Sequence, residues 1–215
     1  MIVTIDGPAG AGKSSVSRGL ADRLGFRFLD TGAMYRAVAH AALQGMADLE
    51  DAASLADVVR TLDLQFDENR VLVNNRDVTS EIRLPEVTAA VRFVADNLAV
   101  RNHLSNLQRK LANAGNIVTE GRDQGTVVFP NAECKIYLTA SADVRAQRRY
   151  QEMIARGVEV SADDILRQQK LRDKQDTERP VGRLQRADDA IEIITDNMST
   201  EDVLDQCERL VRNRF

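Results

Sequence analysis

The clearest chemical signal in this chain is the stretch Ile5 to Ser15, IDGPAGAGKSS. Gly7 is followed by four residues and then by the triplet Gly12 to Ser14, which is the spacing of a phosphate-binding loop. Its glycines let backbone N–H groups turn toward phosphate oxygens at the positive end of the helix that follows. Lys13 is expected to reach the β- and γ-phosphates of a nucleotide, and the Ser14 hydroxyl to bind Mg²⁺. The predicted nucleotide-binding residues are Gly7, Pro8, Ala9, Gly10, Ala11, Gly12, Lys13, Ser14 and Ser15.

Two further groups of polar residues come directly after predicted strands. The segment Asp30 to Arg36, DTGAMYR, follows one strand, and Glu120 to Asp123, EGRD, follows another. Because the carboxyl ends of parallel strands meet at one edge of a sheet, both groups are expected to face one ligand crevice. Arg172, Asp176 and Arg179 are spaced i, i+4 and i+7, which predicts one face of a continuous helix.

Hydrophobic periodicity predicts strands that alternate with helices. Short apolar runs bounded by turn residues predict strands over 2–5, 26–29, 116–119, 134–138 and 191–194. Helical patterns predict helices over 13–24, 85–97, 100–114 and 199–212, and a further helix that begins at 30–32. Two more segments, 145–156 and 161–175, are predicted as polar helices. This alternation is typical of a three-layer α/β P-loop fold with a central parallel sheet.

The region from Leu62 to Arg83 has a different pattern. Residues 64–67 and 71–73 alternate with period two on either side of a turn at 68–70, which predicts a small antiparallel hairpin inserted into the α/β fold. The helix predicted over 161–175 contains almost no apolar residues, so it is expected to be mobile or to act as a cover.

Composition and charge limit the class of protein. The chain has 215 residues and a net charge of −4, with a pI of about 5.3, which favours one core domain and argues against a basic stripe for nucleic acid. Nine arginines between Arg145 and Arg186 indicate a local anion site. Cys134 and Cys207 fit no metal-site spacing and are expected to be reduced thiols. With no signal-peptide pattern after Met1 and no apolar run that could cross a bilayer, we expect a cytoplasmic monomer without nucleic-acid or membrane partners.

Four segments together resemble the bacterial cytidylate kinases, which are P-loop nucleoside monophosphate kinases. They are IDGPAGAGKSS, LDTGAMYRA, GRDQGTVVFP and RDKQDTER, and the similarity extends from Ile2 to the last predicted helix. The predicted hairpin lies where that family carries an insertion in its acceptor-binding region, and RDVTSEIR at 76–83 resembles the family pattern there. The resemblance implies transfer of the γ-phosphoryl group from MgATP to CMP or dCMP, which gives the diphosphate and ADP.

The inventory of side chains agrees with that chemistry. The second pKa of a phosphate monoester is about 6, so the acceptor is already an anion at neutral pH and requires no general base. Catalysis then consists of neutralising charge and aligning two anions, a task for arginines. The two histidines, His40 and His103, fall in none of the four segments.

The resemblance also implies roles for individual residues. Arg36, Arg122 and Arg179 would hold the acceptor phosphate, Arg172 and Asp176 the ribose, and Arg101 and Asp123 the base. A uracil in place of cytosine would leave a buried polar group unpaired, at a cost of about 1–3 kcal/mol. The expected catalytic residues are Lys13, Arg122, Arg148, Arg149 and Arg179. The expected substrate-binding residues are Thr31, Tyr35, Arg36, Arg92, Arg101, Arg122, Asp123, Arg172, Asp176 and Arg179, and Asp30 is expected to reach the Mg²⁺ of Ser14 through a water.

The same resemblance predicts the organisation of the chain. A core of 1–31, 101–144 and 181–215 would carry an acceptor-binding region at 32–100, with the hairpin at about 62–83, and a lid at 145–180 that contains Arg145, Arg148 and Arg149. The chain departs from the family at two points: Arg92 stands where the family has a serine that touches cytosine, and Gly182-Arg183 stands where the family has an Ala-Pro pair.

Other functions remain open at this stage. A kinase for another monophosphate such as UMP would use the same arginines. A kinase for an alcohol would need an aspartate, for which Asp30 or Asp123 could serve. A P-loop ATPase switch would hydrolyse ATP without any acceptor, but it favours a basic surface that this acidic chain lacks.

Overall fold

The structure is a computed structural model that describes residues 1–67, 70–155 and 157–214. The chain divides into two units, Met1–Phe28 with Gly115–Phe215, and Leu29–Ala114. The boundary falls within β2 (Arg27–Asp30), and helix α5 belongs to the second unit. The predicted acceptor region of 32–100 is thus shorter than the observed second unit.

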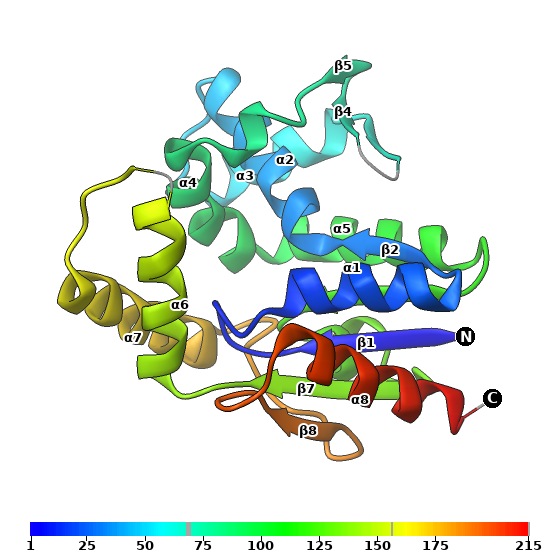
Figure 1. The fold of residues 1–215 in the computed structure, drawn as a ribbon. Coiled ribbons are helices and arrows are strands. Elements are labelled where there is room, and N and C mark those ends of the chain that lie inside the picture. The colour runs from blue at the N-terminus through cyan, green and yellow to red at the C-terminus, as the bar shows by residue number, and fades with distance from the viewer. Residues whose placement is uncertain (68–69, 156, 215) are drawn as a thin grey trace. The chain divides into compact units, whose positions relative to one another are not determined.

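A five-stranded sheet confirms the predicted α/β architecture. Its order is β2-β6-β1-β7-β8 (Figure 1). Its other four strands are β1 (Ile2–Asp6), β6 (Ile117–Gly121), β7 (Cys134–Thr139) and β8 (Ile191–Ile194). β1 is parallel to both β6 and β7, and Asp6 lies opposite Gly121 and Tyr137. The phosphate loop after β1 and the EGRD segment at the end of β6 therefore begin side by side.

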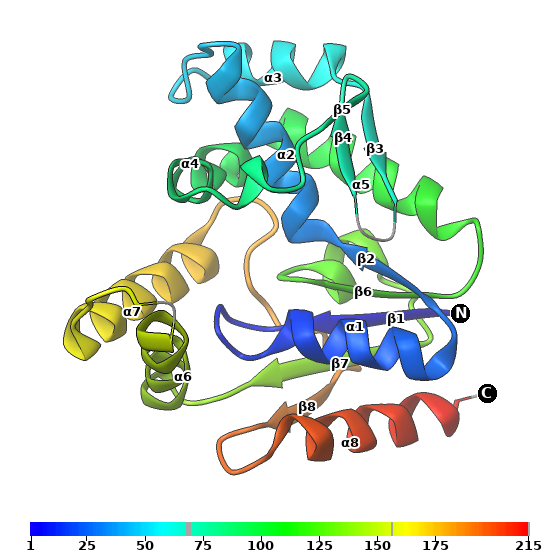
Figure 2. The ribbon, with the colours of Figure 1, turned by 45° about the horizontal axis from the view of Figure 1, so that its top comes forward.

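The α-helices that the structure describes in the first unit are α1 (Lys13–Leu24), α6 (Ala142–Ala155), α7 (Ala162–Glu178) and α8 (Thr200–Arg212). The apolar faces of α1 and α8 pack with the buried strands β1, β6, β7 and β8 in one hydrophobic core. α8 begins with the predicted capping box between Ser199 and Asp202. Both views place α6 and α7 beyond the end of the sheet where β1 leads into the loop (Figures 1 and 2).

The second unit is mainly helical and carries a small ribbon of strands (Figure 2). Its elements after β2 are α2 (Thr31–Gln44), α3 (Ala52–Thr61), β3 (Leu64–Phe66), β4 (Val71–Val73), β5 (Arg76–Asp77), η1 (Glu81–Arg83), α4 (Pro85–Asp96) and α5 (Leu98–Ala112). The antiparallel pairing of β3 with β4 is confirmed, and β5 adds a third strand. Glu68 and Asn69 of the predicted turn lie outside the described residues. Helix α3 was not predicted.

One prediction about α7 needs correction. The helix ends at Glu178, and Arg179 has an extended backbone there, so Arg179 does not continue the helical face of Arg172 and Asp176. The helix buries Ile165, Gln169 and Asp176, and its role as a mobile segment or a cover stays a prediction. Among the helices of the described residues, none combines the length and the hydropathy that a membrane span requires.

Candidate active site

The phosphate loop connects β1 to α1, as its sequence predicts. Gly10 and Gly12 have φ angles of +78° and +87°, which glycine adopts without strain. Lys13 is the first residue of α1; its side chain is buried, and its Nζ donates a hydrogen bond to the carbonyl of Pro8 at 2.7 Å. Burial, and after it the charge of Arg122, lower the pKa of Lys13 to about 7. The lysine ammonium is therefore held against the loop and close enough to Arg122 to feel its positive charge.

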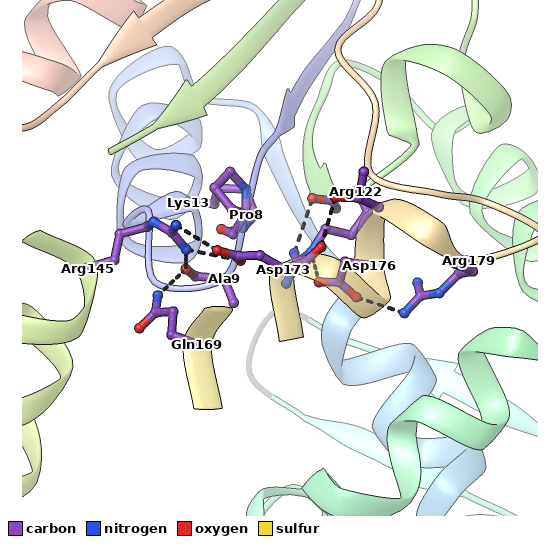
Figure 3. Close-up of polar contacts among 11 residues, drawn as sticks. Pro8, Ala9, Lys13, Arg122, Arg145, Gln169, Asp173, Asp176 and Arg179 are labelled. Carbon is purple, nitrogen blue, oxygen red and sulfur yellow. Dashed lines mark hydrogen bonds and ion pairs between the residues drawn. The ribbon is translucent and has the colours of Figure 1, made fainter. Parts of the chain in front are cut away.

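Arg122, Asp176 and Arg179 form one network in the first unit. The Asp176 carboxylate accepts from Arg122 Nε and from the Arg179 guanidinium, both at 2.8 Å (Figure 3). Burial raises the pKa of Asp176, but the charge and hydrogen bond of Arg122 and the charge of Arg179 lower it more, and the pKa is held below its usual value. The carboxylate thus orients two of the three arginines predicted to grip the acceptor phosphate.

Asp6, just before the phosphate loop, connects β1 to the segment that follows β6. Its carboxylate accepts from the backbone N–H of Gln124 at 2.9 Å and of Gly125 at 2.7 Å. These residues begin η2 (Gln124–Val128), the wide helical turn that follows Arg122 and Asp123. Burial raises the pKa of Asp6 to about 6, although both hydrogen bonds lower it. The last residue of β1 therefore determines the path of the chain directly after two predicted site residues.

Two side chains that contact the loop, and a third that pairs with one of them, were not among the predicted site residues. Arg145 and Gln169 both donate to the carbonyl of Ala9, and Asp173 forms a two-point ion pair with Arg145 (Figure 3). The sequence assigned Arg145 to the lid and gave Gln169 and Asp173 no role, although the spacing of these two residues could have indicated one. Gln169, Asp173 and Asp176 are spaced i, i+4 and i+7, which places them on one face of α7.

The structure gives different surroundings to the two other predicted catalytic arginines. The guanidinium of Arg148 donates to the carbonyl of Thr195 at 2.7 Å and to its hydroxyl at 3.1 Å. Arg149 is exposed and pairs with Glu152 one turn along α6. Neither of these contacts involves the loop or the network of Asp176, so the catalytic roles of both arginines stay predictions.

In the second unit, the structure brings Arg101 and Tyr35 together. The buried guanidinium of Arg101 lies 5.5 Å from the centre of the Tyr35 ring and donates to the carbonyl of Ala95 at 2.9 Å. Arg92 is exposed, and its guanidinium covers the ring of Phe93 at 4.4 Å. Tyr35 thereby supports an arginine predicted to read the base, whereas Arg92 has an apolar contact on its own helix.

The remaining predicted residues lie at the start and within the second turn of α2, directly after β6, and in the C-terminal half of α7. Asp30 caps α2 by accepting from the N–H of Ala33 at 2.8 Å, and Thr31 beside it is buried. Arg36 is partly buried, Arg172 is exposed, and Asp123 is buried.

The donors around the loop suit a hard cation bound through oxygen. Ser14 is exposed in the first turn of α1, where its hydroxyl is available as one ligand. Within the described residues, no group of three or more histidine, cysteine or acidic side chains could hold a metal by itself. Cys134 and Cys207 are free and buried, as expected, and burial raises the pKa of Cys207 to about 12. A Mg²⁺ ion here would need phosphate oxygens as further ligands, which fits the predicted use of Ser14.

Comparison with known proteins places the chain in a family. The family model described as cytidylate kinase matches residues 3–213. A cytidylate kinase of Rhodopirellula baltica is 49% identical over 212 residues, which cover 99% of this chain and 93% of that protein. One of Geobacter sulfurreducens is 45% identical over 218 residues, which cover 100% and 94%. A solved shikimate kinase from Bacteroides thetaiotaomicron, 11% identical, has the same fold with a TM-score of 0.51 and covers 99% of this chain and 98% of that one. With the loop, the buried lysine and the arginine network in place, the chain belongs to the cytidylate kinase family.

Proposed function

We propose that this protein transfers the γ-phosphoryl group of MgATP to CMP or dCMP, giving ADP and CDP or dCDP. The observation that carries the proposal lies in the first unit: the loop with Lys13 and the segment with Arg122 leave the ends of the paired strands β1 and β6. One strand end would thus serve the donor, and its neighbour the acceptor. Membership in the cytidylate kinase family identifies the acceptor class.

On the donor side, the loop and Lys13 bind the phosphates of ATP. The N–H groups at the start of α1 and the Lys13 ammonium offset the negative charge on the β- and γ-phosphates. A bound Mg²⁺, held by the Ser14 hydroxyl and phosphate oxygens, would supply further charge neutralisation. Asp30 caps α2 in the structure, and its contact with the metal through a water stays a prediction.

On the acceptor side, Arg122 and Arg179 hold the phosphate that attacks. Asp176 fixes the direction of both guanidinium groups before substrate binds, so little reorganisation is needed during the reaction. The attacking oxygen is already anionic, which explains why a site rich in arginine carries no histidine among its predicted residues. Arg36 and Arg172 are assigned to the acceptor phosphate and the ribose by the family resemblance alone.

Recognition of cytosine is proposed for Arg101 and Asp123. The exocyclic amine of cytosine donates to a carboxylate, while N3 and O2 accept from a guanidinium, and uracil reverses this pattern at two positions. The contact of Arg101 with the Tyr35 ring and its hydrogen bond to the carbonyl of Ala95 support the role, because together they limit where the guanidinium lies. Arg92 replaces the family's serine and lies against Phe93, so we expect it to contribute little to base selection.

An acceptor screen tests the proposed function. Production of ADP from MgATP is followed by a coupled assay with CMP, dCMP, UMP, shikimate as an alcohol acceptor, or no acceptor. We expect turnover with CMP and dCMP, and much slower turnover with UMP. Equal ATP consumption without any acceptor would indicate an ATPase and contradict the proposal, and preference for shikimate would indicate an alcohol kinase. A location in the cytoplasm and a monomeric state are further expectations, which cell fractionation and light scattering would test.

A further inference from the structure

The carbonyl of Ala9 in the phosphate loop accepts two side-chain hydrogen bonds from distant helices. Arg145 of α6 donates from one terminal nitrogen at 2.9 Å, and Gln169 of α7 donates from Nε2 at 2.7 Å. Figure 3 shows both side chains reaching the same backbone group. Donor groups 136 and 160 residues away therefore hold one peptide of the loop.

The position of this peptide matters because a peptide unit is planar. Every peptide bond in the described residues is trans, so the carbonyl of Ala9 and the N–H of Gly10 lie in one plane and point in opposite directions. When Arg145 and Gln169 hold the carbonyl on the side of α6 and α7, the Gly10 N–H must point away from these helices. Backbone N–H groups of such a loop are the donors that bind phosphate oxygens.

The fit around Gly10 is close enough to restrict the residue type. Its φ angle is +78°, and a Cβ built on Gly10 would lie 2.6 Å from Nε2 of Gln169 and 3.4 Å from the Cβ of Arg145. Both helices thus approach the loop backbone as nearly as a glycine permits. The contact to Ala9 is part of a packed arrangement and not a loose surface hydrogen bond.

Arg145 itself is held in place by its other partners. Nε donates to the carbonyl of Ala140 at 2.9 Å, and the two terminal nitrogens pair with the Asp173 carboxylate at 3.0 and 2.7 Å. The Arg145 side chain is 6% exposed and that of Asp173 23% exposed, so solvent screens this pair little. Such a two-point pair fixes the plane of the guanidinium. Arg145 therefore has its direction determined before any nucleotide binds.

We propose that Arg145 is a positioning residue for the donor loop: fixed by Asp173 and assisted by Gln169, it orients the Ala9–Gly10 peptide so that the Gly10 N–H is presented to the phosphates of ATP. The proposal rests on the proposed function only in that ATP is the donor. It differs from the lid role that the sequence indicated, in which Arg145 would fold over the nucleotides and touch them itself. Asp173 and Gln169, which the sequence left without a role, act through Arg145 and Ala9.

Equilibrium binding of MgATP, measured by calorimetry on the full chain without acceptor, tests the inference. In Gln169→Met the side chain keeps its length but loses the donor, so the Kd for ATP should rise about three- to tenfold. In Arg145→Lys the charge remains but the two-point geometry is lost, and the rise should reach about tenfold or more. The Kd for CMP, measured without ATP, should stay within about twofold of the wild-type value in both variants, because each variant affects only the Ala9–Gly10 peptide of the donor loop.

Two further variants separate positioning from general damage to α7. Asp164→Asn removes a carboxylate that pairs with Arg167 on the exposed side of the same helix, and it should leave both affinities unchanged. Combining Asp173→Asn with Arg145→Lys should raise the ATP Kd less than the product of the single effects, because both changes break one unit. A steady-state assay should show the same division, with KM for ATP raised and KM for CMP nearly constant.

Specific outcomes would overturn the inference. Unchanged ATP affinity in Gln169→Met and Arg145→Lys would show that the Ala9 contacts do not position the loop. Equal losses of ATP and CMP affinity would indicate a merely structural role. Should Arg145→Lys fail to fold, Gln169→Met decides the question by itself. If the wild-type protein binds ATP but does not phosphorylate CMP, the proposed function fails while the inference about the loop is still tested by ATP binding.

Discussion

Replacing Asp176 with asparagine is the most informative single change in the first unit. The Asp176 side chain is 7% exposed, and its two partners, Arg122 and Arg179, are 18% and 9% exposed. Asparagine keeps the size of the side chain and one accepting oxygen but removes the negative charge. Two nearly buried guanidinium groups would then face each other without the carboxylate between them.

The expected cost follows from this burial. Removing one partner of a buried ion pair typically destabilises a protein by about 3–5 kcal/mol, because the remaining charge stays desolvated and unpaired. The residual acceptor of asparagine places the estimate for Asp176→Asn at the lower end, about 3 kcal/mol. For a chain of this size that corresponds to a decrease in Tm of about 6–12 °C.

The effect should also depend on pH in a definite direction. The folded pKa of Asp176 lies below its unfolded value, so its contribution to stability is present above the unfolded pKa of 3.8 and is lost as the pH falls through the folded pKa. The difference between the wild type and Asp176→Asn should therefore be constant from pH 5 to 8. Below about pH 4 it should decrease.

Urea denaturation of the ligand-free proteins at pH 7 measures this difference. The matched control is Asp57→Asn, which breaks a pair with Arg60 whose members are 71% and 72% exposed, and it should change the free energy of unfolding by less than about 0.5 kcal/mol. A loss below about 1 kcal/mol in Asp176→Asn, similar to the control, would refute the reasoning that burial makes this network strong.

Four other changes test separate parts of the structure. Arg122→Ala should lower kcat by about 10³-fold or more while the Kd for ATP changes little, and equal loss of ATP binding would mean that Arg122 serves the donor. Gly7→Ala should cost about 4 kcal/mol or prevent folding, because its Cβ would lie 1.9 Å from a backbone carbonyl oxygen of β7. Gly25→Ala, with φ of +65° and open space around the Cβ, should cost only about 1–2 kcal/mol in thermal unfolding. Burial raises the pKa of Asp6 from 3.8 to about 6, so its favourable contribution is present below 3.8 and lost as the pH rises through 6. The free energy of unfolding of the wild type relative to Asp6→Asn should then fall by about 3 kcal/mol between pH 4 and 7. If urea denaturation gives a difference between the two proteins that does not change with pH, the raised pKa is contradicted.

Much of the fold could be predicted because the relevant signals are local in the sequence. The helix at Lys13–Leu24 and the strand at Ile191–Ile194 were predicted with the observed bounds. Gly25 ends the first of these with a left-handed backbone, and Ser199 with Asp202 caps the last helix. Helix α3 was missed although the sequence carries its signals: Asp51 caps it, and Leu55, Ala56 and Val59 form its buried face at helical spacing.

The candidate site could be predicted only as a set of residue types. The loop, Lys13, and the arginines that follow strand ends are recognisable because the spacing of glycines and the ends of strands depend on neighbouring residues in the sequence. Which acceptor each arginine contacts is a different question. Arg148, predicted as catalytic, donates to Thr195, and Arg149 pairs along its own helix.

The sequence by itself determined the phosphate loop, the five strands of the parallel sheet with most of the helices, and the family, because each depends on short patterns along the chain. Only the tertiary structure decided that Arg145 holds the carbonyl of Ala9, that Asp176 lies between Arg122 and Arg179, and that Asp6 holds the start of η2. The physical reason is that a guanidinium or a buried carboxylate bonds to whichever group folding brings within about 3 Å. Arg122 and Asp176 are 54 positions apart, Asp6 and Gln124 118, and Ala9 and Arg145 136, so these three pairs meet only once the strands and helices have packed.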